Sequence, residues 1–418
     1  MSRNFTIKLS LFINYFVFAI LLNSVGAVIL QVQRNFDVSK ADASILEGFK
    51  DIPIAVISFF IASFLPKIGI KRGMMVALGV MSIMCFLMPN IANDFWYFKM
   101  LFVVIGLSFG IIKIGVYSII GLVTENSKEH SSLMSWIEGF FMVGVLVGNV
   151  FISLFIDDAN PKSTGWLQMY WYLGIMCLAA MTLLSFSKLD ESKAHKDENN
   201  MAEDFLAMMK LIIKPLVMVF VLSAFLFVLI EQSFQTWMPT FYENIIEVPA
   251  SMSIQAGAVL AGAFAIGRIL AGFVLQKVHW LPFTLVCIAA LAICVLVNIP
   301  LTKNLDIDPS QVNWFNAPLV VYIFPLMGLF LAPIYPTINS VILSALPKFL
   351  QSSMSGLIVV FSALGGTTGS IITGHVFEAF DGRTAFYMSL IPMSLLALAL
   401  IMLYRLYKNF KSAEYENA

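Results

Sequence analysis

Residues 95–123 read FWYFKMLFVVIGLSFGIIKIGVYSIIGLV, an almost unbroken run of apolar side chains. A helix needs about 20 predominantly apolar residues to cross the hydrocarbon core of a bilayer. This run is long enough, and it carries one charged residue near its middle, Lys113. It therefore predicts a transmembrane helix with a charged side chain deep inside the bilayer.

The composition of the whole chain is that of a membrane protein. Of its 418 residues, 59% are hydrophobic and only 12% are charged, against about 25% charged in an average globular protein. This composition excludes a disordered chain and argues against a soluble enzyme. Basic and acidic residues are equal in number, at 25 each, so no positive excess is present to attract nucleic acid.

Twelve stretches have the length and polarity of a spanning helix. They are residues 7–32, 44–66, 73–91, 95–123, 132–157, 168–187, 215–242, 252–276, 281–300, 317–345, 352–378 and 384–407. The first is too long for the apolar core of a signal peptide, and no small-residue cleavage site follows it. We therefore expect a retained first helix and an all-α integral membrane protein with twelve transmembrane helices.

Charge placement predicts the orientation. With both termini in the cytoplasm, most of the Lys and Arg residues fall on the inner side, as positive residues do in membrane proteins. The one long polar segment, residues 188–214, then becomes a cytoplasmic linker between six-helix bundles at 1–187 and 215–418. We expect a multi-pass protein of the cell's inner membrane with cytoplasmic N- and C-termini.

The two halves of the chain resemble each other. Gly106 in the fourth span and Gly328 in the tenth are each followed, at the same distance, by a serine and two aliphatic residues. Ser131 opens the fifth span much as Ser352 opens the eleventh. Duplicated six-helix halves resemble the architecture of major facilitator transporters, in which two similar bundles rock about a substrate site.

The N-terminal half contains ionisable side chains inside its spans, where charge is costly and normally faces a cavity or a partner. Lys113 shares a helical face with Tyr117, and Glu138 lies about two turns into the fifth span. Two interpretations are open. Lys113 and Glu138 form a structural ion pair, or Lys113 binds an anionic or hydroxylated solute and Glu138 carries a proton. Asn23 is a neutral candidate for the same site.

The seventh span contains Glu231, Gln235 one turn later on the same face, and Trp237. Sugar sites combine amide and carboxylate hydrogen bonds with an aromatic ring, and the alternative is a helix–helix hydrogen bond. Arg268 in the eighth span is either a cation for the substrate or a charge partner of Glu231. These alternatives also remain open.

Tyr335 occupies the position in the C-terminal half that Lys113 occupies in the N-terminal half, and Asn339 follows one turn later. Pro333 and Pro336 remove backbone hydrogen bonds there, which predicts a local helix break of the kind that lines cavities. Both Tyr335 and Asn339 are therefore candidate substrate contacts.

Glu47, Lys50 and Asp51 enter the second span on one helical face, close to the outer surface. We interpret them as a salt bridge of an outer gate. The cysteines all lie in apolar runs without metal-ligand spacing, and no nucleotide-binding or zinc-protease motif occurs. We therefore expect no metal, no cofactor and no enzymatic activity.

Several motifs resemble the fucose/glucose/galactose–proton symporter family of the major facilitator superfamily. FVLIEQSFQTW carries Glu231 at the acidic position of that family's seventh span, and IYPTINS, IGRILAG and SGLIVVFSALGG resemble its tenth, eighth and eleventh spans. The resemblance implies import of a sugar together with a proton. The N-terminal half departs from the pattern, because Gly26 and Lys113 stand where the family has acids, and Glu138 where it has a glutamine.

We therefore expect a secondary active transporter that imports a small hydrophilic solute by proton symport with alternating access. The exchange of an acid for Lys113 favours a sugar acid or another organic anion over a neutral sugar, and the coupling residues would be Glu138 and Glu231. The expected partners are the solute, the proton and the lipid bilayer, and the protein is expected to be a monomer. An efflux antiporter for a drug or metabolite and a facilitator without ion coupling are the alternatives.

Overall fold

A computed structural model of the chain describes residues 5–124, 127–191, 212–303, 305, 308–309, 311–345 and 348–416. In these residues the regular structure is helical throughout. Eleven helical segments are long and apolar enough to cross a membrane, and α4 (Leu46–Ile68) is a further helix of 23 residues. The expectation of an all-α protein with twelve spanning helices is confirmed.

Two compact units divide the chain. Unit 1 comprises Met1–Asn199 together with Pro249–Ala258, and unit 2 comprises Asn200–Val248 and Val259–Ala418. The division falls in the predicted linker, residues 188–214, of which 192–211 lie outside the described residues.

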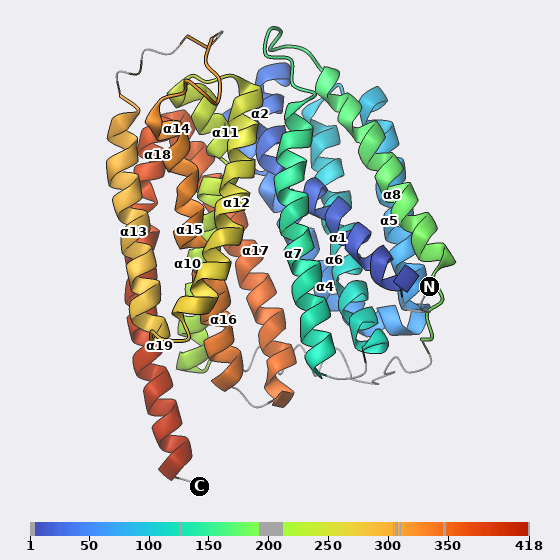
Figure 1. The fold of residues 1–418 in the computed structure, drawn as a ribbon, viewed down its shortest axis with the longest axis vertical. Coiled ribbons are helices and arrows are strands. Elements are labelled where there is room, and N and C mark those ends of the chain that lie inside the picture. The colour runs from blue at the N-terminus through green and yellow to red at the C-terminus, as the bar shows by residue number, and fades with distance from the viewer. Residues whose placement is uncertain are drawn as a thin grey trace. The chain divides into compact units, whose positions relative to one another are not determined.

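Unit 1 contains the helices of the first six spans. They are α1 (Phe5–Asn23), α2 (Val25–Phe36), α3 (Lys40–Ser44), α4 (Leu46–Ile68), α5 (Ile70–Ile91), α6 (Phe95–Val123), α7 (Ser127–Ser153), the short η1 (Gly165–Gln168) and α8 (Met169–Phe186). Helix α4 packs on α6, α5 packs on α8 and α1 packs on α7, and Figure 1 shows α5 and α8 side by side.

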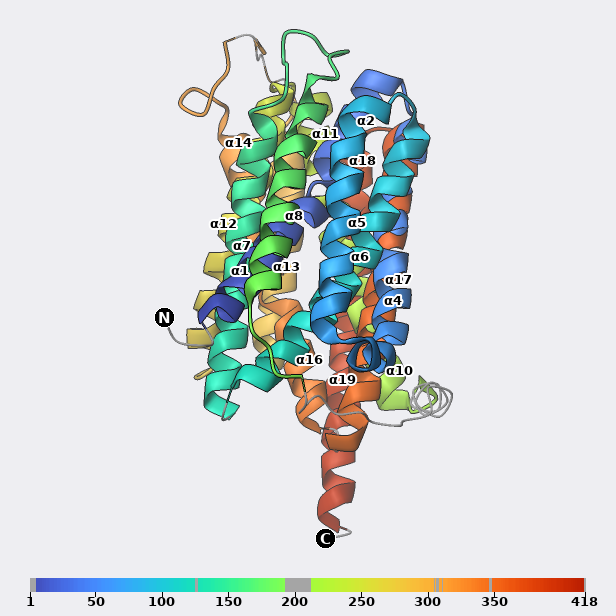
Figure 2. The same cartoon turned by 90° about the vertical axis from the view of Figure 1, so that its right-hand side faces the viewer.

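Unit 2 contains the remaining described helices, although α12 joins it only from Val259 onwards. They are α10 (Pro215–Gln235), α11 (Met238–Phe241), η2 (Tyr242–Ile246), α12 (Ala250–Val274), α13 (Trp280–Leu301), α14 (Leu319–Ile323), η3 (Phe324–Met327), α15 (Gly328–Leu331), α16 (Ile334–Ala345), α17 (Lys348–Ala379), α18 (Gly382–Met388) and α19 (Leu390–Glu416). Helix α10 packs on both α17 and α19. Figure 2 shows α19 running on beyond its neighbours towards the C-terminus.

Several of the predicted spans are interrupted, among them the first and the tenth. The first divides at Ser24, whose hydroxyl donates a hydrogen bond to the carbonyl of Leu21. The tenth divides into α14, η3, α15 and α16, and the break between α15 and α16 lies at Ala332–Pro333. The break expected from the proline pattern is confirmed, because Pro333 has no N–H to continue the helix.

Glycines allow close contacts between helices in each unit. A Cβ atom added at Gly144 of α7 would lie 2.9 Å from the carbonyl oxygen of Phe16 in α1, and one at Gly365 of α17 would lie 2.3 Å from that of Phe225 in α10. The glycine one turn later repeats each contact. Small residues allow such close approach between membrane helices. The two contacts therefore occupy matching places in the two halves.

The glycines that first indicated the repeat behave in the same way. A Cβ at Gly106 of α6 would meet the carbonyl oxygen of Lys50 in α4 at 2.3 Å, and one at Gly328 of α15 would meet that of Leu260 in α12 at 2.9 Å. The internal repeat read from the sequence therefore corresponds to equivalent packing within each unit.

Unit 1 is held at one end by a loop that the sequence did not single out. The Glu191 carboxylate accepts hydrogen bonds from the backbone N–H groups of Ile70 (2.8 Å) and Lys71 (3.0 Å), which begin α5. The Lys71 ammonium in turn donates to the carbonyl oxygens of Ser185 (2.8 Å) and Ser187 (2.7 Å) at the end of α8. An anion at a helix N-terminus and a cation at a C-terminus both favour the helix dipoles. We call this arrangement the Glu191 clamp.

The first residues of α12 belong to unit 1 and lie against the end of α7. Asp158 accepts a 3.0 Å hydrogen bond from the backbone N–H of Ser251, and Gln255 donates one of 3.0 Å to the Ser153 hydroxyl. The Asp158 carboxylate thus satisfies a backbone donor that the start of α12 leaves open.

Candidate functional site

Three of the predicted residues meet in unit 1. Helix α6 places Lys113 and Tyr117 one turn apart, and the Tyr117 hydroxyl donates a 2.8 Å hydrogen bond to Oε1 of Glu138 on α7. All three side chains are partly exposed. They therefore form a polar contact between two helices that are otherwise apolar on these faces.

Lys113 forms neither a hydrogen bond nor an ion pair with any residue that the structure describes. Its electrostatic partner is the Glu138 carboxylate, which attracts the ammonium without touching it. The structural ion pair between Lys113 and Glu138, one of the two interpretations of the sequence, is therefore not formed. None of the residues that the structure describes takes up the three N–H donors of the ammonium.

Tyr15 on α1 joins this cluster, although sequence reasoning missed it. Its ring centroid lies 6.4 Å from that of Tyr117, and the rings of Phe109 and Phe141 lie 6.2 Å and 5.7 Å away. Its buried hydroxyl has no hydrogen-bond partner within bonding distance among the described residues, while Tyr117 and Glu138 are near enough to act on it electrostatically. A tyrosine inside an apolar run is the signal that points to it. We call Tyr15, Lys113, Tyr117 and Glu138 the lysine cluster.

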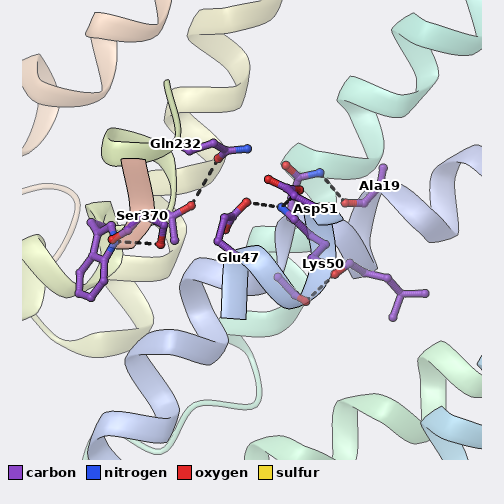
Figure 3. Close-up of polar contacts among 11 residues, drawn as sticks. Ala19, Glu47, Lys50, Asp51, Gln232 and Ser370 are labelled. Carbon is purple, nitrogen blue, oxygen red and sulfur yellow. Dashed lines mark hydrogen bonds and ion pairs between the residues drawn. The ribbon is translucent and has the colours of Figure 1, made fainter. Parts of the chain in front are cut away.

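The charged residues of α4 form the ion pairs that their spacing predicts. The Lys50 ammonium contacts the Glu47 carboxylate and lies 3.5 Å from Oδ1 of Asp51 (Figure 3). The Glu47 side chain is 0% exposed and that of Lys50 is 7% exposed, so the pair is desolvated. These contacts lie within the first two turns of one helix, and their role in an outer gate stays a prediction. Asn23 donates a 2.8 Å hydrogen bond to the Ala19 carbonyl.

A second polar cluster forms in unit 2 around Tyr335. Its hydroxyl lies 2.8 Å from the Ser362 hydroxyl on α17, its ring stacks on Phe227 of α10 at 5.5 Å, and the Glu231 charge acts on it. Asn339, one turn along α16, has a buried side-chain oxygen without a hydrogen bond among the described residues. Because a buried amide oxygen costs free energy when unpaired, this cluster has unused hydrogen-bonding capacity.

The remaining predicted residues of unit 2 lie elsewhere. Trp237 is 0% exposed and its indole N–H donates to the backbone and hydroxyl oxygens of Ser370, at 3.1 Å and 3.2 Å (Figure 3). Its ring is thus a packing element and has no free face for a solute, contrary to the expectation. Gln235 is partly exposed. Arg268 is exposed and forms no ion pair with Glu231 in the described part of the chain.

The repeat relates the two clusters. Lys113 and Tyr335 occupy matching places, and each lies on a helix that is joined to the next long helix by a tyrosine hydroxyl. In unit 1 that hydroxyl belongs to Tyr117 and reaches an acid, whereas in unit 2 it belongs to Tyr335 itself and reaches a serine. The interhelical hydrogen bond thus involves a carboxyl group in unit 1 and two neutral hydroxyl groups in unit 2.

The described residues contain no group of three or more His, Cys, Asp or Glu side chains that would hold a metal ion. Cys85, Cys177 and Cys287 are buried, and Cys294 is partly so. All four are free thiols packed in apolar helices, as the sequence indicated.

Spanning helices in two related units, with ionisable side chains inside the spans, define a membrane transporter of small solutes. The sequence model of the Major Facilitator Superfamily matches residues 10–366. The chain therefore belongs to the Major Facilitator Superfamily. It is a multi-pass membrane transporter and not an enzyme, as expected.

Curated relatives share the length of the chain at low identity. A protein TsgA homolog of Buchnera aphidicola subsp. Baizongia pistaciae is 21% identical over 380 residues, which is 90% of both chains. Bypass of stop codon protein 6 of Saccharomyces cerevisiae is 20% identical over 87% of this chain and 75% of its own length.

Solved structures share the fold. An inward-facing bacterial homolog of the human lysosomal transporter Spinster has a TM-score of 0.73 at 16% identity, covering 98% of this chain and 96% of its own. The D-xylose-proton symporter has a TM-score of 0.70 at 14% identity, covering 96% and 98%. The E. coli fucose:proton symporter has a TM-score of 0.60 at 15% identity, covering 96% and 99%.

Proposed function

We propose that this transporter is a secondary active importer of a small hydrophilic solute that carries an acidic group, such as a sugar acid or another organic anion. Import is coupled to protons and proceeds by alternating access. The observation that carries the proposal is Lys113, a cation inside a span that has no hydrogen bond or ion pair among the described residues. A charge held there without a partner is costly, and an anionic solute supplies one.

Each unit contributes a different part of the chemistry. The lysine cluster of unit 1 offers a cation and the proton carrier Glu138. The Tyr335 cluster of unit 2 offers neutral hydrogen-bonding groups for hydroxyls, with Asn339 one turn away and Glu231 as a second proton carrier. Gln235, partly exposed, is a further candidate contact. Arg268, exposed and unpaired in the described part, is a further cation for the solute.

The similarity to a D-xylose-proton symporter supports a hydrophilic solute and proton coupling. We further propose that the protein acts as a monomer in the inner membrane with both termini in the cytoplasm, and that Glu47, Lys50 and Asp51 belong to its outer gate. Export in exchange for protons and uncoupled facilitation are the other directions that the same fold permits.

Uptake into proteoliposomes tests the substrate class. Labelled neutral sugars (D-glucose, L-fucose) are compared with acidic ones (D-glucuronate, D-gluconate) for the wild type and for Lys113→Met. We expect uptake of an acidic probe by the wild type only. The matched control is Lys99→Met, on the same helix but near its start and placed over the Phe95 ring, which should transport normally. Equal uptake of acidic probes by Lys113→Met and the wild type would remove the basis of the proposal.

A further inference from the structure

The charges of the lysine cluster connect the binding of an anionic solute with the protonation of Glu138. Lys113 carries one positive charge, and Glu138 is the group that acts on it electrostatically. The two groups act on each other electrostatically but form no ion pair, and the Glu138 carboxylate accepts a hydrogen bond from Tyr117. We propose that Glu138 and the acidic group of the solute compete for Lys113, so that each anion that binds brings one proton onto Glu138. This rests on the proposed function.

The net charge of the cluster should stay constant on binding because the surroundings have low polarity. When a solute carboxylate binds Lys113, the cluster holds two anions and one cation. Like charges at close range disfavour ionisation of one of them, and an uncompensated charge in a poorly solvated site is costly. A hydronium ion of the aqueous phase gives its proton to the Glu138 carboxylate: one O–H bond of hydronium breaks, the O–H bond of the carboxyl group forms, and a water molecule is left. The cluster returns to the net charge that it had before the solute arrived.

The groups around Glu138 limit where the proton goes. Helix α7 packs against α1 and α6. From α6, Lys113 and Tyr117 approach Glu138, and from α1, Tyr15 does so. Along α7, His130 and Glu129 lie more than two turns before Glu138, and Glu129 pairs with Lys8 of α1 at 2.9 Å.

The start of α12 contributes no ionisable side chain that could take up the proton in place of Glu138. Residues 249–258, which lie against the end of α7, contain no ionisable side chain. Glu138 is therefore the carboxylate placed to take up the proton.

Tyr15 and Tyr117 suit the two states of Glu138. The ionised carboxylate accepts a hydrogen bond from Tyr117, at 2.8 Å. A protonated carboxyl also carries an O–H donor, and the Tyr15 oxygen lies buried within electrostatic range without a hydrogen bond in the described residues. We assign Tyr117 as a positioning residue, because its hydroxyl holds the Glu138 carboxylate through this hydrogen bond.

Calorimetric binding to the full-length protein in detergent tests the linkage. D-Glucuronate, D-galacturonate and D-gluconate are titrated in buffers with different heats of ionisation, which gives the number of protons taken up on binding. We expect about one proton per anion for the wild type, and a Kd that rises about tenfold per pH unit while Glu138 is ionised. For Glu138→Gln we expect no proton uptake, a flat pH profile and retained binding. Glu129→Gln, on the same helix, should behave as the wild type.

The outcomes separate the two proposals. Binding of an acidic probe by the wild type without proton uptake, or a Glu138→Gln protein that keeps the wild-type slope, overturns the linkage and leaves the importer proposal standing. Failure of all acidic probes to bind overturns both. The proton count on the wild type stands even where a variant does not fold. Tyr117→Phe should move the pH range of the slope while keeping the count at one, which a purely structural role would not do.

Discussion

Tyr117 and Glu138 join α6 to α7 through a hydrogen bond of 2.8 Å between the phenol hydroxyl and a carboxylate oxygen. Interhelical hydrogen bonds in membranes contribute about 0.6 kcal/mol on average and up to about 1.7 kcal/mol. This bond belongs at the upper end, because bonds to charged groups are the stronger ones. It links α6 and α7, two of the three helices that carry the lysine cluster.

Replacing Tyr117 by Phe removes the hydroxyl and keeps the ring packed near Tyr15. We expect the free energy of unfolding to fall by about 1–2 kcal/mol, measured by denaturant titration in detergent. Tyr172→Phe on an exposed face of α8 is the matched control. Equal stability of the two variants would show that the bond contributes nothing.

Gly365→Ala tests the contact between α17 and α10 that has a counterpart at Gly144 in unit 1. The added Cβ would lie 2.3 Å from the Phe225 carbonyl oxygen, and overpacking of this kind costs about 1–3 kcal/mol. We expect a lower melting temperature and a smaller monodisperse fraction. Gly272→Ala, at a position where nothing lies within 4 Å, should be neutral or stabilising, because alanine favours the helix by about 1 kcal/mol. Similar melting temperatures for both variants would contradict the contact.

The Glu191 clamp should contribute to the stability of unit 1. Glu191→Ala removes the acceptor for two backbone N–H groups at the start of α5, and loss of a helix cap costs about 0.5–2 kcal/mol. We expect the melting temperature to fall accordingly. Lys188→Ala, an exposed charge three residues earlier, should leave it unchanged, and a fall of the same size there would argue against a specific cap.

Asp381 makes a pH-dependent contribution to the free energy of unfolding. Partial burial raises the pKa of its carboxyl, but the backbone N–H and hydroxyl of Thr384 and the charge of Arg383 outweigh it and hold the pKa below its ordinary value. A depressed pKa in the folded state contributes stability above the unfolded pKa of about 3.9, and this is lost as the pH falls through the folded value. Asp381→Asn should therefore lose less stability than the wild type between pH 5 and about pH 3. Parallel melting curves would contradict this.

The sequence predicted the parts of the site that depend on charge and helix spacing. Lys113 was identifiable because a charged side chain inside a transmembrane span is costly and normally faces a cavity or a partner. The helix break at Pro333 follows from the missing backbone N–H of proline. Glu47 and Lys50 pair as their spacing requires. The packing of Gly365 on α10 also agrees with the repeat.

What the sequence did not determine is the direction in which each helical face points. Tyr15 and Trp237 are both aromatic residues with a polar atom, yet only Tyr15 brings an unused hydroxyl to a charged cluster, whereas Trp237 is bonded to Ser370. Helical periodicity states which residues share a face and not which neighbour covers it. Glu191 was missed because a segment rich in charged residues is normally exposed to solvent. Its contact with the start of α5 depends on the course of the loop after α8, which the sequence does not show.

The most direct test of the account is accumulation of an acidic solute in proteoliposomes under an imposed pH gradient. With the outside acidic, we expect the wild type to raise the internal concentration of labelled D-glucuronate or D-gluconate above the external one, and an uncoupler to abolish the excess. Glu138→Gln should equilibrate the same solute without accumulating it. An internal concentration that never exceeds the external one in the wild type, or that falls when the outside is acidified, would contradict proton-coupled import.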